Sequence, residues 1–151
     1  LTMSIHKIKP IGKIFKGIPA SPGIAIGPAH LLGKDSISVE ERTLSPEEIS
    51  REIQKFQEAL QKTKEEILSI RKHVQNNIGE ENAKVFDAHL LILEDKIVLD
   101  ETIRRIKDEQ KNADWLYFQI MRGFHNLMIS GNDDYLRERG LDILDVKRRV
   151  I

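Results

Sequence analysis

Residues 44–79 have the sequence LSPEEISREIQKFQEALQKTKEEILSIRKHVQNNIG, which opens with a nearly complete set of helix-start residues. Ser45 is a favourable N-cap, Pro46 suits the first helical position, and Glu48 can reach back to the N-cap backbone to close a capping box. These residue types satisfy backbone N–H groups that have no partner at the start of a helix. The sequence therefore predicts a helix that begins just after Ser45.

The same segment has the apolar periodicity of a long amphipathic helix. Leu44 and Ile49 occupy the two positions of a hydrophobic staple at its start. Farther along, apolar residues recur at intervals of three, four or seven, which places them on one helix face. They are Ile49, Ile53, Phe56, Leu60, Ile67, Ile70 and Val74. Gly79 follows, so the helix is expected to end near Asn77.

Four shorter helices are predicted after it, at 81–93, 96–110, 113–128 and from one of residues 132–134 to residue 150. Asn112 is the expected cap of the helix at 113–128, and Gly131 is its expected stop. Its expected core face consists of Leu116, Ile120, Phe124 and Leu127. Because the connections are short, neighbouring helices should be antiparallel. The predicted fold is mostly α, a bundle of two helical hairpins.

Residues 14–44 differ from the rest because they are rich in glycine and proline and contain two strand-like runs, 14–18 and 24–32. Pro22 and Gly23 suit the central positions of a type II turn, since proline presets φ and glycine tolerates a positive φ. Strands this short need another element to pack on. The predicted division is a mobile extension at 1–13, a small, incomplete β region at 14–44 and a helical domain at 45–151.

The composition excludes several classes of protein. The 24 Lys and Arg balance the 24 Asp and Glu, so there is no basic surplus to neutralise nucleic-acid phosphates. The absence of cysteine excludes disulfides, thiol nucleophiles and Cys-ligated zinc, and it fits a reducing cytosol. The longest apolar run, at 90–93, is far shorter than the roughly 20 residues that cross a bilayer. We therefore expect a cytoplasmic protein with no membrane insertion and no nucleic-acid partner.

No catalytic or metal-binding constellation is evident. The five histidines are scattered, and no two have the i,i+4 spacing of a helical zinc site. Gly17, Gly23 and Gly27 precede no Gly-Lys-Ser/Thr, so they do not form a P-loop. Ser21 lacks the strand–nucleophile–helix context of a hydrolase elbow. The sequence predicts no catalytic residue, no metal site and no cofactor in this chain.

The second predicted helix has the most informative surface pattern. Glu80 and Glu81 lie at its start, where acids offset the helix dipole. Farther along, Leu91 and Ile92 fall partly outside the expected core face. Apolar residues near acids can form a docking patch for a partner with an apolar centre and a basic rim. Packing against a neighbouring helix is the alternative, and the residues alone favour it.

Three segments together resemble one family, Enzyme I (phosphoenolpyruvate-protein phosphotransferase) of the bacterial sugar phosphotransferase system. GIPASPGIAIG at 17–27 is similar to the family's opening segment, which related phosphoenolpyruvate-using enzymes partly share. FDAH at 86–89 with LED at 93–95 resembles the family's "F-x-A-H-x-x-x-L-x-D" helix. DYLRER at 134–139 and DILDV at 142–146 are similar to its "E-Y-L-x-E-R-x-x-D-I-x-D-V" helix. The segments occur in the family's order and spacing.

The resemblance implies an activity that this chain cannot perform alone. Members of the family transfer a phosphoryl group from phosphoenolpyruvate to one of their histidines and then to the small carrier HPr, in sugar uptake. That histidine lies in a "G-G-x-x-S-H-x-A-I" motif, which this sequence does not contain. The resemblance therefore implies an N-terminal fragment that docks HPr but is inactive by itself. Mg²⁺ binding and homodimerisation are expected of the full-length parent, outside this chain.

The resemblance also implies which residues bind HPr. In the family, docking uses the second helix, its continuation and an arginine of the last helix. Carried over residue by residue, the docking set is Glu80, Glu81, Asp87, His89, Leu91, Ile92 and Arg139. Lys96 and Ile97 stand where relatives often have acids, which weakens the expected acidic patch. By the same resemblance, residues 14–44 are the first strands of an α/β phosphohistidine domain and 45–151 are the HPr-binding subdomain.

Two other functions remain open. The chain could belong to an enzyme of the dikinase or phosphoenolpyruvate synthase type that shares only the Ser-Pro-Gly segment, or it could be a non-catalytic helical scaffold. The first alternative leaves the downstream helices unexplained. The second leaves the Ser-Pro-Gly segment unexplained.

Overall fold

The computed structural model describes residues 16–17, 22–24, 26–28, 38–130 and 133–151. The chain divides into two units, Leu1–Asp35 and Ser36–Ile151. In the first unit, Gly23 has a φ of 117°, the positive value that the predicted turn requires. The strands predicted between residues 14 and 44 lie largely outside the described residues, and the described part of that range contains no strand.

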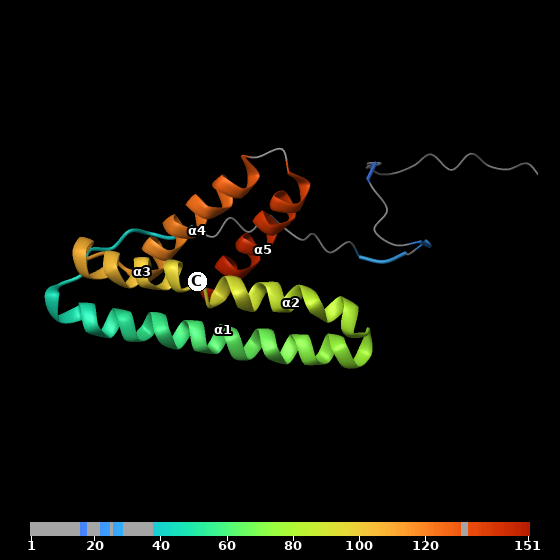
Figure 1. Cartoon of the computed structure of the whole chain (residues 1–151), viewed down its shortest axis with the longest axis horizontal. Coiled ribbons are helices and arrows are strands. Elements are labelled where there is room, and N and C mark those ends of the chain that lie inside the picture. The colour runs from blue at the N-terminus through green and yellow to red at the C-terminus, as the bar shows by residue number, and fades with distance from the viewer. Residues whose placement is uncertain (1–15, 18–21, 25, 29–37, 131–132) are drawn as a thin grey trace, which may run out of the picture. The chain divides into compact units, whose positions relative to one another are not determined.

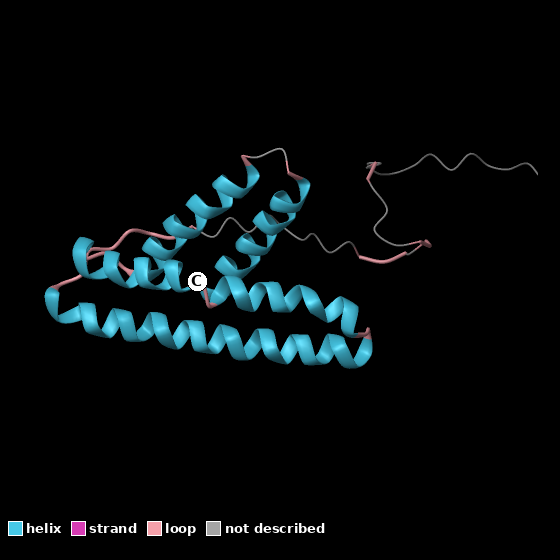
Figure 2. Ribbon diagram, viewed as in Figure 1, coloured by secondary structure: helices cyan, strands magenta, loops and turns pink. Residues whose placement is uncertain are grey.

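The second unit is a helical bundle. Its described elements are η1 (Pro46–Glu48), α1 (Ile49–Asn77), α2 (Glu80–Leu93), α3 (Lys96–Glu109), α4 (Ala113–Ile129) and α5 (Asp134–Val150), shown in Figure 1. Figure 2 shows that most of the described part of this unit is helical. The five α-helices predicted from the sequence are confirmed, with ends that differ by few residues. The mostly α fold class is confirmed as well.

The start of α1 combines a polar contact with a buried anchor. A carboxylate oxygen of Glu48 accepts a 2.8 Å hydrogen bond from the Ser45 backbone N–H. This hydrogen bond is the main cause that lowers the pKa of Glu48. Leu44 is buried in the core, and Ile49 packs against the same core. The two apolar residues therefore fix how the chain enters the helix.

The first hairpin is asymmetric, because α1 has 29 residues whereas α2 and α3 have 14 each. After Gly79, whose φ is 115°, α2 returns antiparallel to α1. In Figure 1, α3 continues beyond the break at Glu94, so α2 and α3 lie one after the other along α1. At the break, Asp95 accepts hydrogen bonds from the backbone N–H groups of Ile97 (2.9 Å) and Val98 (3.1 Å) and starts α3.

The second hairpin consists of α4 and α5. Asp133 accepts a 2.9 Å hydrogen bond from the Tyr135 backbone N–H, so Asp133 is the cap among the three candidates in the sequence. A Cβ on Gly140 would lie only 2.9 Å from Cγ2 of Ile129. The missing side chain at Gly140 therefore allows α5 to approach α4 closely. Gly131, the predicted stop of α4, lies outside the described residues.

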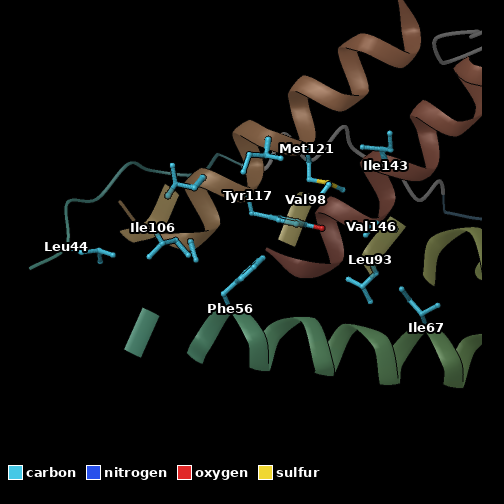
Figure 3. Packing of buried hydrophobic residues seen from close by; sticks show 13 residues of the cluster. Leu44, Phe56, Ile67, Leu93, Val98, Ile106, Tyr117, Met121, Ile143 and Val146 are labelled. Atoms are coloured by element: carbon cyan, nitrogen blue, oxygen red, sulfur yellow. The ribbon is translucent and has the colours of Figure 1, made fainter. Parts of the chain in front are cut away.

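The core lies where all five helices meet. Phe56 of α1 and Tyr117 of α4 form a tilted aromatic pair with ring centroids 5.4 Å apart. The core side chains, drawn in Figure 3, are Leu44, Phe56, Ile67, Leu93, Val98, Ile106, Ala113, Leu116, Tyr117, Ile120, Met121, Ile143 and Val146. Each large apolar side chain buried there contributes about 1.5–3 kcal/mol relative to an exposed one. Since every helix supplies core residues, the two hairpins form one bundle.

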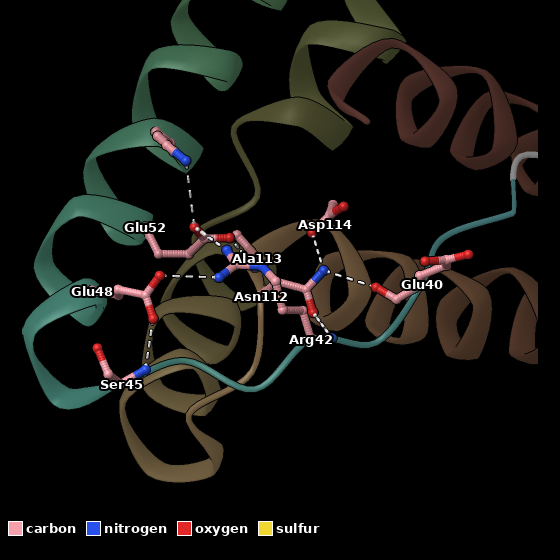
Figure 4. A network of polar contacts seen from close by, with 9 residues as sticks. Glu40, Arg42, Ser45, Glu48, Glu52, Asn112, Ala113 and Asp114 are labelled. Carbon is pink, nitrogen blue, oxygen red and sulfur yellow. Dashed lines mark hydrogen bonds and ion pairs between the residues drawn. The ribbon is translucent and has the colours of Figure 1, made fainter.

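Polar contacts tie the segment before α1 to the connection between α3 and α4 (Figure 4). The Asn112 side chain accepts a 2.7 Å hydrogen bond from the Arg42 N–H and donates a 3.0 Å bond to the Glu40 carbonyl. Glu52 of α1 accepts a 3.0 Å bond from the Ala113 N–H. The prediction that Asn112 is the N-cap residue of α4 is confirmed, although its side chain makes no capping hydrogen bond. Asn112 has the N-cap position, but its side chain is engaged elsewhere and Glu52 takes over the capping contact.

Candidate partner-docking surface

The three acids predicted for docking lie on α2, and two of them are held by α1. Arg71 donates hydrogen bonds to Glu80 at 3.0 Å and to Asp87 at 2.6 Å. Hydrogen bonding to Arg71 is the main reason that the pKa of Asp87 lies below its ordinary value. Glu81 is the most exposed of the three acids and pairs with Lys84 at 2.7 Å. The acidic rim, which consists of Glu80, Glu81 and Asp87, thus has two carboxylates fixed by α1 and a more exposed one that pairs with a lysine of its own helix.

Leu91 and Ile92 are adjacent in sequence but differ in environment. The Leu91 residue is 75% exposed. Ile92 is partly buried, packs against the core and lines a hollow of about 140 Å³ between α2, α3, α4 and α5, together with Phe124. Packing against neighbouring helices therefore accounts for Ile92. It does not account for Leu91, which stays an unpacked leucine on the outside of α2.

His89 lies in the interior. The residue is only 6% exposed, and its ring packs edge-on against Phe86 with centroids 5.6 Å apart. Its Nε2 atom is 3.3 Å from Oδ1 of Asp142, and its Nδ1 atom is 3.5 Å from Oδ2 of Asp145. Both aspartates belong to α5. His89 therefore joins α2 to α5 and has little surface of its own to offer a partner.

Arg139 lies beside this contact on α5. Its Nη1 atom donates a 3.2 Å hydrogen bond to Oδ2 of Asp142. Its Nε and Nη2 atoms donate to the hydroxyl of Tyr135 at 3.2 and 3.1 Å, and hydrogen bonding to Tyr135 is the main cause that raises the pKa of Arg139. The guanidinium carbon is 5.1 Å from the centroid of the Tyr135 ring. Arg139 is thus held in one orientation while remaining partly exposed.

Two residues that shape this surface were missed from the sequence. Tyr135 and Asp142 both contact Arg139, yet neither belongs to the predicted docking set. Helical spacing offered a signal, because residues three and four positions from Arg139 share its face of α5.

The expectation that Leu127 belongs to the core face of α4 is wrong, since Leu127 is 68% exposed. It lines an open apolar depression at Gly123, where glycine supplies no side chain to pack against.

The described residues contain neither a metal-binding cluster nor a membrane-spanning helix. In residues 38–130 and 133–151, and in the short described stretches before them, no group of His, Cys, Asp and Glu is arranged to hold a metal ion. Among the helices of the described residues, none combines the length and the apolar character needed to span a membrane.

The sequence and the helical fold match known proteins. Residues 16–139 match the family described as "PEP-utilising enzyme, N-terminal", and the chain belongs to that family. The phosphoenolpyruvate-protein phosphotransferase of Priestia megaterium is 34% identical over 139 residues, which are 92% of this chain and 24% of the relative. The enzyme of the same name from Bacillus subtilis (strain 168) is 36% identical over 135 residues, 89% of this chain and 23% of the relative.

A solved structure agrees with the sequence relatives. The solution NMR structure of an Enzyme I protein, nEIt, has a TM-score of 0.74 and 35% sequence identity to this chain, and the match covers 86% of this chain and 52% of that one. These matches confirm the family and the helical fold predicted from the sequence. The chain spans about a quarter of the length of the curated relatives that it matches.

Proposed function

We propose that the helical unit Ser36–Ile151 is the docking module of a phosphoenolpyruvate-protein phosphotransferase, and that its partner is HPr, the small phosphocarrier of the sugar phosphotransferase system. The observation that carries the proposal is the 75% exposed Leu91 on a helix that also presents three acids. An apolar centre with a charged rim is the usual composition of a protein-binding patch. The relatives that share this module are named for phosphoryl transfer to a protein, which supports a phosphotransferase over a dikinase or a scaffold.

In this proposal the chain binds and does not catalyse. The full-length cytoplasmic enzyme, a homodimer that uses Mg²⁺, takes the phosphoryl group from phosphoenolpyruvate onto a histidine and passes it to HPr. None of the five histidines of this chain lies in a "G-G-x-x-S-H" context. The chain alone is therefore expected to bind HPr without receiving or donating a phosphoryl group.

The surface suits a small basic partner with an apolar spot. Burial of Leu91 against that spot would contribute about 1.5–3 kcal/mol. Glu80, Glu81 and Asp87 would attract the basic rim, which raises the association rate and fixes the orientation more than it raises affinity. The partly exposed guanidinium of Arg139 would meet an acceptor on the partner.

The apolar centre is tested by Leu91→Asp. Placing a charge on the contact is expected to weaken HPr binding at least about tenfold, as substitutions of central interface residues do. The melting temperature should not change, because Leu91 is already solvated.

Leu141→Asp is the matched control, since Leu141 is 65% exposed on α5 and outside the docking set. Calorimetric titration with HPr and thermal melting of both variants measure the two effects. A large loss of stability in Leu91→Asp, or equal binding losses in the two variants, would contradict the proposal.

The acidic rim is tested by salt. The Debye length shortens from about 30 Å at 0.01 M to about 3 Å at 1 M salt, so steering by Glu80, Glu81 and Asp87 should fade over that range. HPr binding is expected to weaken as salt rises, and Glu81→Gln should make that dependence shallower. Affinity that does not respond to salt would remove the electrostatic part of the proposal and leave the apolar part.

A further inference from the structure

His89 is the centre of two short chains of charged groups. Its Nε2 atom faces Asp142 at 3.3 Å, and its Nδ1 atom faces Asp145 at 3.5 Å. The second oxygen of Asp142 lies 3.2 Å from Arg139. Asp145 in turn accepts a 2.9 Å hydrogen bond from Arg149. One buried imidazole on α2 is therefore linked through two carboxylates to two arginines on α5.

The first chain of contacts, the Asp142 branch, runs from His89 through Asp142 to Arg139 on the docking surface. The Asp142 side chain is 18% exposed, and its two oxygens are divided between His89 and Arg139. The carboxylate is therefore fixed from both sides, with an interior ring on one side and a surface guanidinium on the other. Arg139 is further held by the Tyr135 hydroxyl. A long side chain that is already held loses less conformational freedom when a partner binds it.

The second chain of contacts, the Asp145 branch, runs from His89 through Asp145 to Arg149, away from the docking surface. Arg149 lies in the last turn of α5, ten residues after Arg139 and so about 15 Å farther along the helix axis. The Asp145 carboxylate is also more exposed than that of Asp142. The two branches share His89 but differ in strength, because Nε2 is within hydrogen-bond distance of Asp142 whereas Nδ1 lies 3.5 Å from Asp145 without a hydrogen bond. Only the Asp142 branch reaches a predicted docking residue. Asp145 thus provides a matched control for Asp142.

From this geometry we propose that His89 is a positioning residue for HPr binding, which holds Asp142 so that Asp142 keeps Arg139 in its binding orientation. His89 itself does not touch the partner, because it is only 6% exposed. This inference rests on the proposed function, since it takes Arg139 to be a docking residue. The family resemblance placed His89 among the residues that contact HPr. In this proposal His89 instead supports Arg139 from the interior.

Four substitutions separate this role from a general structural one. His89→Leu removes both ring contacts, and Asp142→Asn removes the bridging charge. His89→Gln keeps an N–H donor on a side chain of similar reach, so it should restore the contact to Asp142. Asp145→Asn cuts the other branch and leaves the Asp142 branch intact.

The first experiment is calorimetric titration of the variants with HPr. His89→Leu and Asp142→Asn are expected to weaken binding roughly two- to tenfold, the range for a side chain that must be ordered on binding. His89→Gln and Asp145→Asn should stay within about twofold of the wild type, on the same basis. In an Arg139→Ala background, His89→Leu should cause no further loss, because both changes act on one contact. Full additivity of the two losses would overturn the proposal.

The second experiment needs no partner. In the chain alone, the Nε–H of Arg139 donates to Tyr135, and this group has its own resonance in ¹H–¹⁵N spectra. The resonance is expected to shift or broaden in His89→Leu and Asp142→Asn and to stay in place in Asp145→Asn. An unchanged resonance in His89→Leu would overturn the proposal, and if that variant does not fold, Asp142→Asn decides in its place. If wild-type chain does not bind HPr, the proposed function fails, while this spectrum still decides whether His89 holds Arg139.

Discussion

Glu52 and Thr63 lie on the buried face of α1 although neither is apolar. Glu52 is 8% exposed, and its carboxylate accepts a hydrogen bond from the Ala113 N–H at the start of α4. An acid at a helix start also offsets the helix dipole. The Thr63 hydroxyl donates a 3.1 Å bond to the carbonyl of Arg149 near the end of α5. Each polar side chain is tolerated in the interior because it satisfies a backbone group of another helix.

We predict that Glu52→Ala lowers the free energy of unfolding by about 2 kcal/mol, because the buried Ala113 N–H loses its acceptor. Glu52→Gln should cost less, since its amide oxygen can still accept from Ala113. Glu58→Ala is the control, because Glu58 lies exposed on the same helix, and it should change stability by no more than about 0.5 kcal/mol. Urea unfolding followed by circular dichroism measures all three. Equal losses for Glu52→Ala and Glu58→Ala would contradict the capping role.

The helix α2 depends on its neighbours. It has 14 residues, a length at which an isolated helix is marginal in water. Ala83 and Leu93 are buried in the bundle, Arg71 of α1 holds its outer acids, and His89 joins it to α5. Docking residues on α2 are therefore positioned from two sides. This arrangement presents Leu91 on a rigid helix rather than on a loop.

We predict that Asp87 of α2 makes the stability of the fold depend on pH in the acid range. The pKa of Asp87 is lowered from 3.8 in the folded chain, mainly by hydrogen bonding to Arg71. A carboxyl group with a lowered pKa stabilises the fold above its unfolded pKa, and that stabilisation is lost as pH falls through the folded value. Asp87→Asn should therefore be less stable than wild type at neutral pH, with a difference that shrinks below pH 3.8. Urea unfolding across pH measures this, with the exposed Asp100→Asn as the control, and a difference that does not depend on pH would contradict it.

In the molecule as a whole, the helical unit includes residues that precede its first helix. The Leu44 side chain is buried in the core, and its N–H donates a 2.7 Å bond to the Gln110 carbonyl. Thr43 pairs with Lys111 as an isolated antiparallel bridge. Arg42 and Asn112 exchange hydrogen bonds. The segment thus closes the bundle at the connection between α3 and α4.

Two truncations test this closure. A chain that begins at Ser36 should unfold with the same free energy as the helical unit of the full chain, because it keeps every contact of the segment. A chain that begins at Ser45 should lose at least about 2 kcal/mol, since Leu44 leaves the core and Asn112 loses its partners. Urea unfolding of both proteins measures the difference. Equal stability of the two truncated chains would show that the segment is not part of the folded unit.

The sequence by itself determined the helices and the family, because both depend on local patterns. Helix ends are marked by local residues, because caps and positive φ angles act over a few positions. The examples are Ser45 with Glu48, Gly79 and the acids at 133–134. The three ordered motifs identified the family, which the comparisons confirm.

Only the tertiary structure decided how the candidate surface is built. Leu91 and Ile92 have the same apolar character, yet one is exposed and the other packs against the core, because the arrangement of α4 and α5 determines which side of α2 is covered. His89 carries no sequence mark of burial, and its role follows from Asp142 and Asp145, which lie more than fifty residues away. Exposure and long-range pairing depend on how helices pack against one another, and local periodicity does not contain that information.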